Sequence, residues 1–319
     1  MTAKTEEFKN KGLCLLCNSK LSDRGFEAKD YLTSVEGSYL YKECSFCKSY
    51  IQTPVVSQAF LYHCYNSQSL TYKKPIEKSR SVFVKVISRV VMLIDLLFLS
   101  KKRKRTLFLE PSLPPGKKVL EIGCSYGEKL SKLKDRGYDV TGIELAEESV
   151  QKAKELFGLN IINSDIDSCD FKENQFDVII MRMVLEHLRN PQTIIRKISS
   201  WLREGGELLI SVPAAEGAEF KEDMRHSYLT QAPYHIFIPT MEGLRELFSD
   251  NYKIVDYQYQ FAINDLVKSA QFQRRDRRTL KNRLLAKSEV VGYLYGLVRH
   301  LMVLAGRKAS RVNIRLIKL

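Results

Sequence analysis

The sequence lacks a long hydrophobic run free of charged residues, and this bears first on membrane insertion. A membrane-spanning helix needs about 20 predominantly apolar residues. The two longest apolar stretches are Val82–Leu99 and Val290–Ala305, and charged side chains interrupt both. The opening segment, MTAKTEEFKNKG, has acidic residues and no apolar core, unlike a secretory signal peptide. We therefore expect a cytoplasmic chain whose cysteines are reduced.

Low-complexity tracts and internal repeats are also missing, and tryptophan occurs once in 319 residues. Hydrophobic residues make up 44% of the sequence, which excludes a chain that is disordered throughout. A proline-rich joint over 111–116 suggests a domain boundary. We predict a four-cysteine module over 10–70, a basic apolar helical linker over 71–116 and a large domain over 117–319. The large domain would contain a basic helical insertion at 261–310.

Basic residues outnumber acidic residues at both ends of the sequence but not in its centre. The formal net charge of +14 divides into +9 over residues 1–110, −6 over 111–269 and +11 over 270–319. A nucleic-acid-binding protein is expected to have its basic surface on the main domain. The acidic centre therefore argues against nucleic acid as the partner, and the positive charge belongs to two flanks.

Cysteine is scarce, and four of the seven cysteines form two regularly spaced pairs. Two residues separate Cys14 from Cys17 and Cys44 from Cys47, and 26 residues lie between the pairs. Two such pairs can direct four thiolates at one Zn²⁺ ion. A site with four thiolate ligands is closed, so we expect a structural zinc ion in a ribbon-like module. The remaining cysteines, Cys64, Cys124 and Cys169, show no such spacing.

Strand and helix patterns alternate from residue 117 onward. Short apolar runs predict seven strands, at 119–123, 139–145, 159–165, 176–183, 207–212, 252–260 and 311–318. Segments with helical spacing at 127–136, 146–157, 191–202 and 241–248 predict helices between them. Such alternation with short connections is typical of a doubly wound α/β sheet with helices on both faces. The predicted fold class is therefore α/β and Rossmann-like.

A glycine-containing turn joins the first predicted strand of this domain to its first helix. Gly123 and Gly127 flank the turn in VLEIGCSYG, with Ser125 where a dinucleotide-binding turn has its middle glycine. Such turns let a ligand approach the backbone amides at a helix N-terminus. Glu144 ends the second strand, where a carboxylate can accept hydrogen bonds from both hydroxyls of a ribose. Asp165 ends the third strand, within reach of an adenine amino group, so the pattern predicts a nucleoside-containing ligand.

Five segments resemble, in order, the motif series of the class I S-adenosylmethionine-dependent methyltransferases. They are LEIGCSYG at 120–127, GIEL at 142–145, NSD at 163–165, FDVIIMRMVLEHLRNP at 176–191 and LREGGELLISVP at 202–213. Glu121, Gly123 and Gly127 keep the family's acidic and glycine positions, and Ser125 departs from them. The resemblance implies an S-adenosylmethionine cofactor, a seven-stranded sheet and an antiparallel last strand at 311–319.

The resemblance also implies which residues bind the cofactor. The turn from Gly123 to Gly127 would line its methionine part, Glu144 would hold the ribose and Asp165 would flank the adenine. Two residues at the end of the fourth strand would lie beside the sulfonium. The full implied set is Glu121, Gly123, Cys124, Ser125, Gly127, Glu144, Leu145, Asp165, Ile166, Met181 and Arg182.

Two histidines are the candidate catalytic residues. Positioning supplies much of the rate of methyl transfer, but a hydroxyl acceptor usually also needs a base. His187 lies in LEHL, and His235 lies in APYHIF, a region that caps the substrate pocket in similar methyltransferases. His187 could instead only form a local hydrogen bond at a helix start. Tyr228 and Tyr234 are candidates to line the same pocket.

The two basic flanks have amphipathic helical patterns. An apolar stretch over 82–99 precedes KKRKR at 101–105, and RRDRR at 274–278 precedes apolar residues at helical spacing over 280–305. Basic amphipathic helices are typical of membrane-surface segments. We expect an anionic membrane surface as the partner of residues 82–105 and 270–310, at the inner face of the membrane. The alternative is that these helices pack on each other or in a homodimer.

The patterns together predict methyl transfer to a small-molecule acceptor. A cysteine module ahead of such a domain resembles a group associated with sugar or surface-polysaccharide methylation, which implies a free, nucleotide-linked or lipid-linked saccharide methylated at oxygen or carbon. One alternative is an RNA methyltransferase that uses the zinc ribbon and the basic flanks. Against it, no aromatic and basic stacking platform is evident, and MRMV stands where an Asn/Asp-Pro-Pro-aromatic motif would be. Another alternative is a non-catalytic membrane-associated interaction protein.

Overall fold

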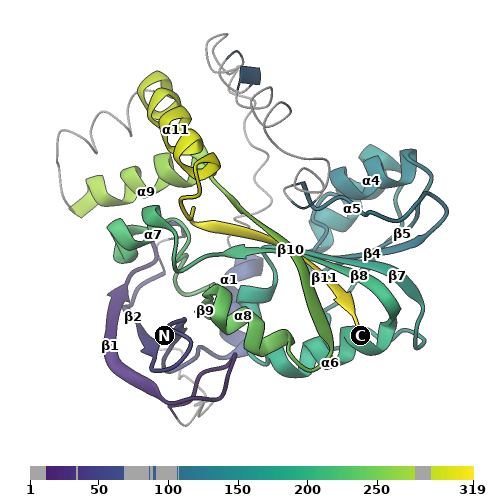
Figure 1. Cartoon of the computed structure of the whole chain (residues 1–319), viewed down its shortest axis with the longest axis horizontal. Coiled ribbons are helices and arrows are strands. Elements are labelled where there is room, and N and C mark those ends of the chain that lie inside the picture. Colours follow the sequence, from purple (N-terminus) through teal and green to yellow (C-terminus); the bar gives the residue numbers. More distant parts are fainter. Residues whose placement is uncertain are drawn as a thin grey trace.

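Two β-sheets dominate the structure, a computed structural model that describes residues 12–33, 35–67, 86, 89, 90, 106, 108–276 and 289–319. A seven-stranded sheet crosses the molecule, and a four-stranded sheet lies at one end of it (Figure 1). Most of the predicted helical stretch over 82–99 lies outside the described residues. The same is true of the basic run at 101–105 and of residues 277–288.

The large sheet has the strand order β10-β11-β8-β7-β4-β5-β6. Its strands are β4 (Lys118–Ile122), β5 (Asp139–Glu144), β6 (Ile161–Asn163), β7 (Phe176–Arg182), β8 (Leu202–Pro213), β10 (Tyr252–Gln260) and β11 (Arg311–Lys318). The strands from β8 to β6 pair in parallel, and β11 pairs antiparallel with both β8 and β10. The predicted α/β class, with seven strands and an antiparallel last strand, is confirmed.

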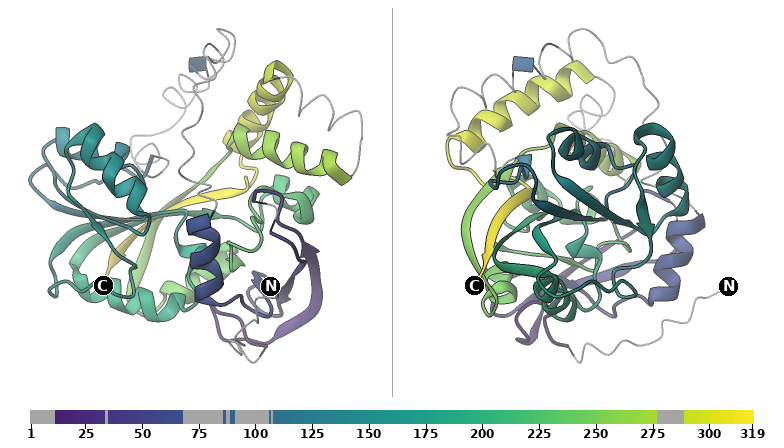
Figure 2. Two further views of the ribbon diagram at one scale, coloured as in Figure 1. Left: turned by 180° about the vertical axis from the view of Figure 1, so that it is seen from behind. Right: turned by 90° about the vertical axis from the view of Figure 1, so that its right-hand side faces the viewer.

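Side chains of the central strands alternate between two apolar layers, because successive residues of a strand point to opposite faces. Leu120 packs in one core cluster with Trp201, whereas its neighbour Val119 packs in another with Leu133. The helices that cover the sheet are α4 (Glu128–Asp135), α5 (Glu147–Phe157), α6 (Pro191–Trp201) and α8 (Met241–Phe248). Helices α4 and α5 lie on one face and α6 on the other (Figures 1 and 2). The central strands are therefore covered on both faces, as their continuous apolar sequences predict.

The small sheet has the order β1-β2-β3-β9 and combines two distant parts of the sequence. Its first three strands are β1 (Leu21–Ala28), β2 (Tyr39–Cys44) and β3 (Tyr50–Gln52), and its fourth is β9 (Phe237–Ile238). Phe26 and Tyr41 stack with ring centroids 5.2 Å apart, and Phe220 packs edge-on against Phe26. The cysteine module and the segment after β8 therefore share one sheet and one core.

The other helices of the described residues lie between or beside the two sheets. They are α1 (Gln58–Ser67), α7 (Ala218–Glu222), α9 (Ile263–Asp276) and α11 (Glu289–Leu304), with the short 3₁₀ helices η1 (Leu185–His187) and η2 (Met224–His226). Helices α9 and α11 contact each other and form the described part of the predicted insertion (Figure 1). Among the described residues, no helix combines the length and the apolar character needed to span a membrane.

Candidate functional site

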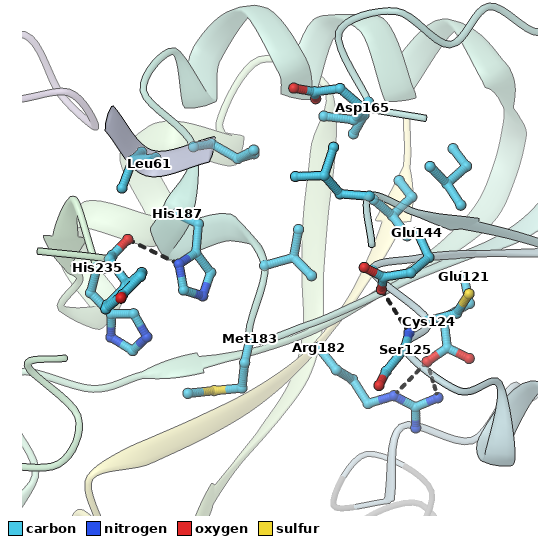
Figure 3. Close-up of a pocket in the computed structure, with 18 of the residues that line it drawn as sticks. Leu61, Glu121, Cys124, Ser125, Glu144, Asp165, Arg182, Met183, His187 and His235 are labelled. Atoms are coloured by element: carbon cyan, nitrogen blue, oxygen red, sulfur yellow. Dashed lines mark hydrogen bonds and ion pairs between the residues drawn. The ribbon is translucent and has the colours of Figure 1, made fainter. Parts of the chain in front are cut away.

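A pocket of about 570 Å³ opens at the carboxyl ends of β4, β5 and β7 (Figure 3). Ligands of open α/β sheets bind at this edge, where the loops that follow the strands meet. The lining residues fall into two groups. One group comes from the turns after β4, β5 and β6, and the other comes from η1, the segment before β9, and helices α1 and α9.

The turn after β4 depends on backbone conformations that glycine favours. Gly123 has a φ of 69° and Gly127 a φ of 75°. A Cβ atom on Gly123 would lie 2.5 Å from Cγ2 of Val184, and one on Gly127 would lie 2.6 Å from Cδ1 of Leu159. Ser125, between them, also has a positive φ, of 51°. The turn thus keeps its left-handed geometry although a serine replaces the middle glycine.

The carboxylate of Glu144 is held at the end of β5 by two backbone amides. It accepts hydrogen bonds from N of Ser125 at 2.8 Å and N of Ala146 at 3.0 Å. The side chain is buried and lines the pocket. Asp165 also lines the pocket and accepts a hydrogen bond from N of Asp167 at 3.1 Å. Carboxylate oxygens have further lone pairs, so both acids can accept hydrogen bonds from a ligand.

Glu121 and Arg182 form a buried ion pair on the floor of the pocket. Nη2 and Nε of Arg182 lie 2.6 and 3.0 Å from Oε1 of Glu121. The other carboxylate oxygen, Oε2, is buried without a hydrogen-bond partner among the described residues. Burial raises the pKa of Glu121, and the charge of Arg182 opposes that rise. A donor group on a ligand would satisfy Oε2 and favour the charged carboxylate.

The structure brings most of the predicted cofactor residues to the pocket. Glu121, Gly123, Cys124, Ser125, Glu144, Leu145, Asp165, Ile166 and Arg182 all line it. Met181 does not, because it is fully buried in the core beneath the sheet. Met183, two residues further on, lines the pocket instead and has a φ of 51°. Gly127 lies just behind the lining as the residue before α4.

His187 and His235 meet at the opposite end of the pocket, with ring centroids 4.7 Å apart in an edge-to-face arrangement (Figure 3). Nδ1 of His187 lies 2.9 Å from O of Tyr234, and Nδ1 of His235 lies 2.7 Å from O of Leu229. A carbonyl only accepts, so in His235 Nδ1 carries the proton and Nε2 is the basic atom, whereas the His187 ring has a second backbone partner, Met183, besides Tyr234.

Burial keeps both imidazoles neutral. It lowers the pKa of His187 to about 4. It also lowers the pKa of His235, and the electrostatic interaction with the nearby His187 lowers that pKa further. Glu186 lies 3.8 Å from Nε2 of His235, and burial raises the pKa of Glu186 to about 8. At neutral pH the two imidazoles and the Glu186 carboxyl are therefore mainly in their uncharged forms.

Residues far apart in the sequence complete this end of the pocket. Tyr228 and Tyr234 line it, in agreement with their candidate role. Leu32, Gln58 and Leu61 come from the N-terminal segment, and Gln231, Lys268 and Arg311 from the C-terminal half. No local sequence signal marks these residues as pocket residues, because only the pairing of β3 with β9 and the packing of α9 bring them together.

The four paired cysteines converge at the base of the small sheet. Sγ of Cys14 lies 3.7 Å from Sγ of Cys47, and Sγ of Cys17 lies 3.5 Å from Sγ of Cys44. All four sulfur atoms lie within 4.8 Å of one another. A Zn–S distance of about 2.3 Å implies an S–S distance of about 3.8 Å in a tetrahedral site. The donor set and spacing therefore fit a tetrahedral, thiolate-binding metal ion.

Both cysteine pairs lie on the same kind of backbone turn. Asn18 follows the first pair with a φ of 58°, and Lys48 follows the second with a φ of 62°. In each turn this following residue donates its N–H to the carbonyl of the first cysteine, at 3.0 Å for Asn18 and 3.2 Å for Lys48. Two equivalent turns that face each other place the four thiols without any contribution from distant side chains.

Residues 97–255 match a family model described as a methyltransferase domain. This part of the chain is a class I S-adenosylmethionine-dependent methyltransferase domain. The order of its sheet and the turn after β4 agree with that assignment.

Two curated relatives illustrate the sequence similarity of the methyltransferase domain. The ubiquinone biosynthesis O-methyltransferase of Glaesserella parasuis is 38% identical over 106 residues, which are 30% of this chain and 45% of that enzyme. Phosphoethanolamine N-methyltransferase 1 of Arabidopsis thaliana is 31% identical over 135 residues, which are 39% of this chain and 26% of that enzyme. The chain therefore spans less than half the length of these curated relatives.

Among solved structures, one similar chain is phosphoethanolamine N-methyltransferase 2 of Haemonchus contortus, in complex with phosphomonomethylethanolamine and S-adenosylhomocysteine. The alignment covers 75% of this chain and 61% of that one, with 18% sequence identity and a TM-score of 0.43.

The left-handed backbone of Ser125 in the methyltransferase domain yields a prediction about stability. Replacing Ser125 with Gly should change the free energy of unfolding by less than about 1 kcal/mol, because relief of backbone strain offsets the greater entropy of the unfolded chain. Ser125→Val should lower it by about 1–3 kcal/mol, because a β-branched residue resists positive φ. Urea unfolding measures both variants, and a glycine variant less stable than the valine variant would contradict this geometry.

Proposed function

We propose that the chain transfers a methyl group from S-adenosylmethionine to a saccharide acceptor in surface glycan biosynthesis. The observation that carries the proposal is a single pocket with two chemically different ends. One end has the glycine turn and the two carboxylates expected for a nucleoside cofactor, and the other has two neutral histidines. The proposed units are the cysteine module at 10–70, the linker at 71–116 and the methyltransferase domain at 117–319 with its insertion at 261–310.

The cofactor end offers a donor or acceptor for each part of S-adenosylmethionine. Glu144 is proposed to accept the ribose hydroxyls, and Asp165 with Ile166 to flank the adenine. Oε2 of Glu121 suits the amino group of the methionine part, since it is buried and without a partner. The backbone from Gly123 to Gly127 would lie against the same part. When bound, the cofactor supplies an activated methyl group, and this chain's residues hold and orient it.

The acceptor end is suited to a polyhydroxylated molecule. Gln58, Gln231 and Tyr234 offer amide and phenol groups at its wall, which can donate to and accept from sugar hydroxyls. We assign removal of the acceptor proton to His187 or His235. Both rings are neutral at pH 7 because burial lowers their pKa values, so each has an unprotonated ring nitrogen, although the same shift makes each a weaker base than a solvent-exposed histidine.

The cofactor proposal predicts the effect of one carboxylate. The wild-type chain should bind S-adenosylhomocysteine in a calorimetric titration, and Glu144→Ala should weaken that binding by about tenfold or more, because charge-assisted hydrogen bonds to the ribose are lost. Glu147→Ala is the matched control, since Glu147 is exposed at the start of α5 and lies outside the pocket. Absence of binding to the wild type, or equal affinity in Glu144→Ala, would refute the assignment.

The cysteine cluster is proposed to hold a structural Zn²⁺ ion through Cys14, Cys17, Cys44 and Cys47. The support is the donor set, the sulfur–sulfur distances and the pair of equivalent turns. Main-chain atoms of the second turn also bind the methyltransferase domain, because O of Cys47 accepts a hydrogen bond from Oγ1 of Thr240 at 2.5 Å. Metal binding would therefore stabilise the contact between the small sheet and α8.

Zinc removal gives a direct test. The purified chain should contain about one zinc ion, and Cys47→Ser should abolish it and lower the free energy of unfolding. Cys169→Ala is the matched control, because this buried thiol lies outside the cluster. Elemental analysis with thermal unfolding measures both properties. A zinc-free wild-type chain, or an unaltered zinc content in Cys47→Ser, would rule the site out.

Helix α11 is the proposed membrane-surface segment. Leu294, Val298 and Leu301 follow one another at helical spacing, and each side chain is about half exposed, at 49%, 50% and 47%. The sequence from residue 270 to residue 319, to which α11 belongs, has a net charge of +11. An exposed apolar stripe among basic residues suits an anionic lipid surface. The proposed location is cytoplasmic, at the inner face of the membrane.

The membrane proposal predicts sedimentation with vesicles that contain phosphatidylglycerol. Leu294→Glu with Val298→Glu should abolish sedimentation, because carboxylates replace the apolar stripe and are repelled by anionic lipid. Ile162→Glu is the control, since Ile162 is similarly exposed but lies on β6. Vesicle binding that survives the double substitution would overturn the proposal. So would a wild-type dimer that the double substitution converts to a monomer, which would make the stripe an interface between copies.

A further inference from the structure

The carboxylates that line the pocket all lie at one of its ends, together with two cationic residues, Lys129 and Arg182. Four carboxylates line it, Glu121, Glu128, Glu144 and Asp165, and all of them belong to the turns and helix of the cofactor end. At the end formed by η1, the segment before β9 and α9, the charged lining residues are Lys268 and Arg311, both cationic. An acceptor that enters this end meets positive charge and no lining carboxylate among the described residues.

Arg311 is already balanced by an acid. Its Nε and Nη2 lie 2.5 and 2.6 Å from the two carboxylate oxygens of Asp265, which does not line the pocket. The charge of Arg311 also acts on His235 and on Tyr228, so these groups lie near one another. Arg311 therefore lies near both His235 and Tyr228, and its own charge is paired with that of Asp265.

Lys268 has no such acid. Its Nζ donates a hydrogen bond to the hydroxyl of Tyr228 at 2.7 Å and lies 3.9 Å from the centre of that ring. Within the described part of the chain, no carboxylate forms an ion pair with it, although the residue is partly buried. An ammonium group has three N–H donors, so donors remain for a ligand. The excess positive charge at the acceptor end thus belongs to Lys268.

We propose that the acceptor has a phosphate or diphosphate group that is bound by Lys268 together with the hydroxyl of Tyr228 and, more distantly, by Arg311. This inference rests on the proposed function, and it selects among the proposed acceptors. A nucleotide-linked or lipid-linked saccharide has a diphosphate, whereas a free sugar has none. The basic segment from residue 270 onward would also favour the approach of an anionic acceptor.

The test is a calorimetric titration of the full chain with three probes, inorganic diphosphate, uridine diphosphate and farnesyl diphosphate. Each titration is run with and without saturating S-adenosylhomocysteine. Lys268→Met should weaken binding of the tightest probe by about tenfold or more, because a charge-assisted hydrogen bond is lost while the length of the side chain is kept. Lys268→Arg should retain binding within about threefold of the wild type, since it restores a cation.

Controls separate charge at the pocket from charge in general. Lys253→Met removes an exposed lysine from β10, away from the pocket, and should bind the probes as the wild type does. Thermal unfolding of each variant shows whether it is folded. Equal affinity of S-adenosylhomocysteine in Lys268→Met and wild type would show that the cofactor end is intact.

The outcomes distinguish this inference from the proposed function. If S-adenosylhomocysteine binds but no probe binds at millimolar concentration, or if Lys268→Met binds as tightly as wild type, the phosphate site is refuted and the methyltransferase assignment stands. If S-adenosylhomocysteine fails to bind, the proposed function is refuted. Preference for uridine diphosphate supports a nucleotide-linked acceptor, and preference for farnesyl diphosphate supports a lipid-linked one.

Discussion

The main-chain pairing of β3 with β9 is the interaction on which the acceptor end of the pocket depends. Tyr50 and Ile51 pair with Ile238 and Phe237, and N of Gln52 donates to O of Ile236 at 2.8 Å. The hydroxyl of Tyr41 donates to O of His235 at 2.8 Å, and the side-chain amide of Gln52 donates to O of Pro233 at 3.2 Å. The N-terminal sheet therefore holds the backbone that positions His235, and the two ends of the pocket are supported by different parts of the chain.

The two ends of the pocket differ in how well the sequence predicts their residues. The strands around 119–123 and 176–183, the glycine turn and Glu144 were predictable because each depends on local periodicity and on a turn between neighbouring elements. Strand β9 was not, because two residues pair with a strand almost 200 positions earlier and show no pattern of their own. The sequence also does not predict Leu32, Gln58 and Lys268 as pocket residues, because only tertiary packing brings them there.

At the end of β7, the methionine that lines the pocket is Met183, two residues after the predicted Met181. A strand alternates its side chains between faces, and Met181 points into the core with Ile179, so it cannot lie beside a ligand. The left-handed backbone at Met183 then turns the chain and directs that side chain to the pocket. The charge of the chain divides in a similar way. Four acids from the centre of the sequence line one end of the pocket, and Lys268 from the basic insertion lines the other end.

We propose that the cysteine module is part of the acceptor site rather than an independent appendage, because it pairs with the backbone around His235. The direct test is hydrogen–deuterium exchange on the full chain, before and after treatment with a metal chelator that would remove a zinc ion from the four cysteines. We expect the chelator to make exchange faster in residues 21–52 and also in 230–238, with unchanged exchange in the turn at 121–127. Faster exchange confined to 21–52, with 230–238 as protected as before, would contradict it.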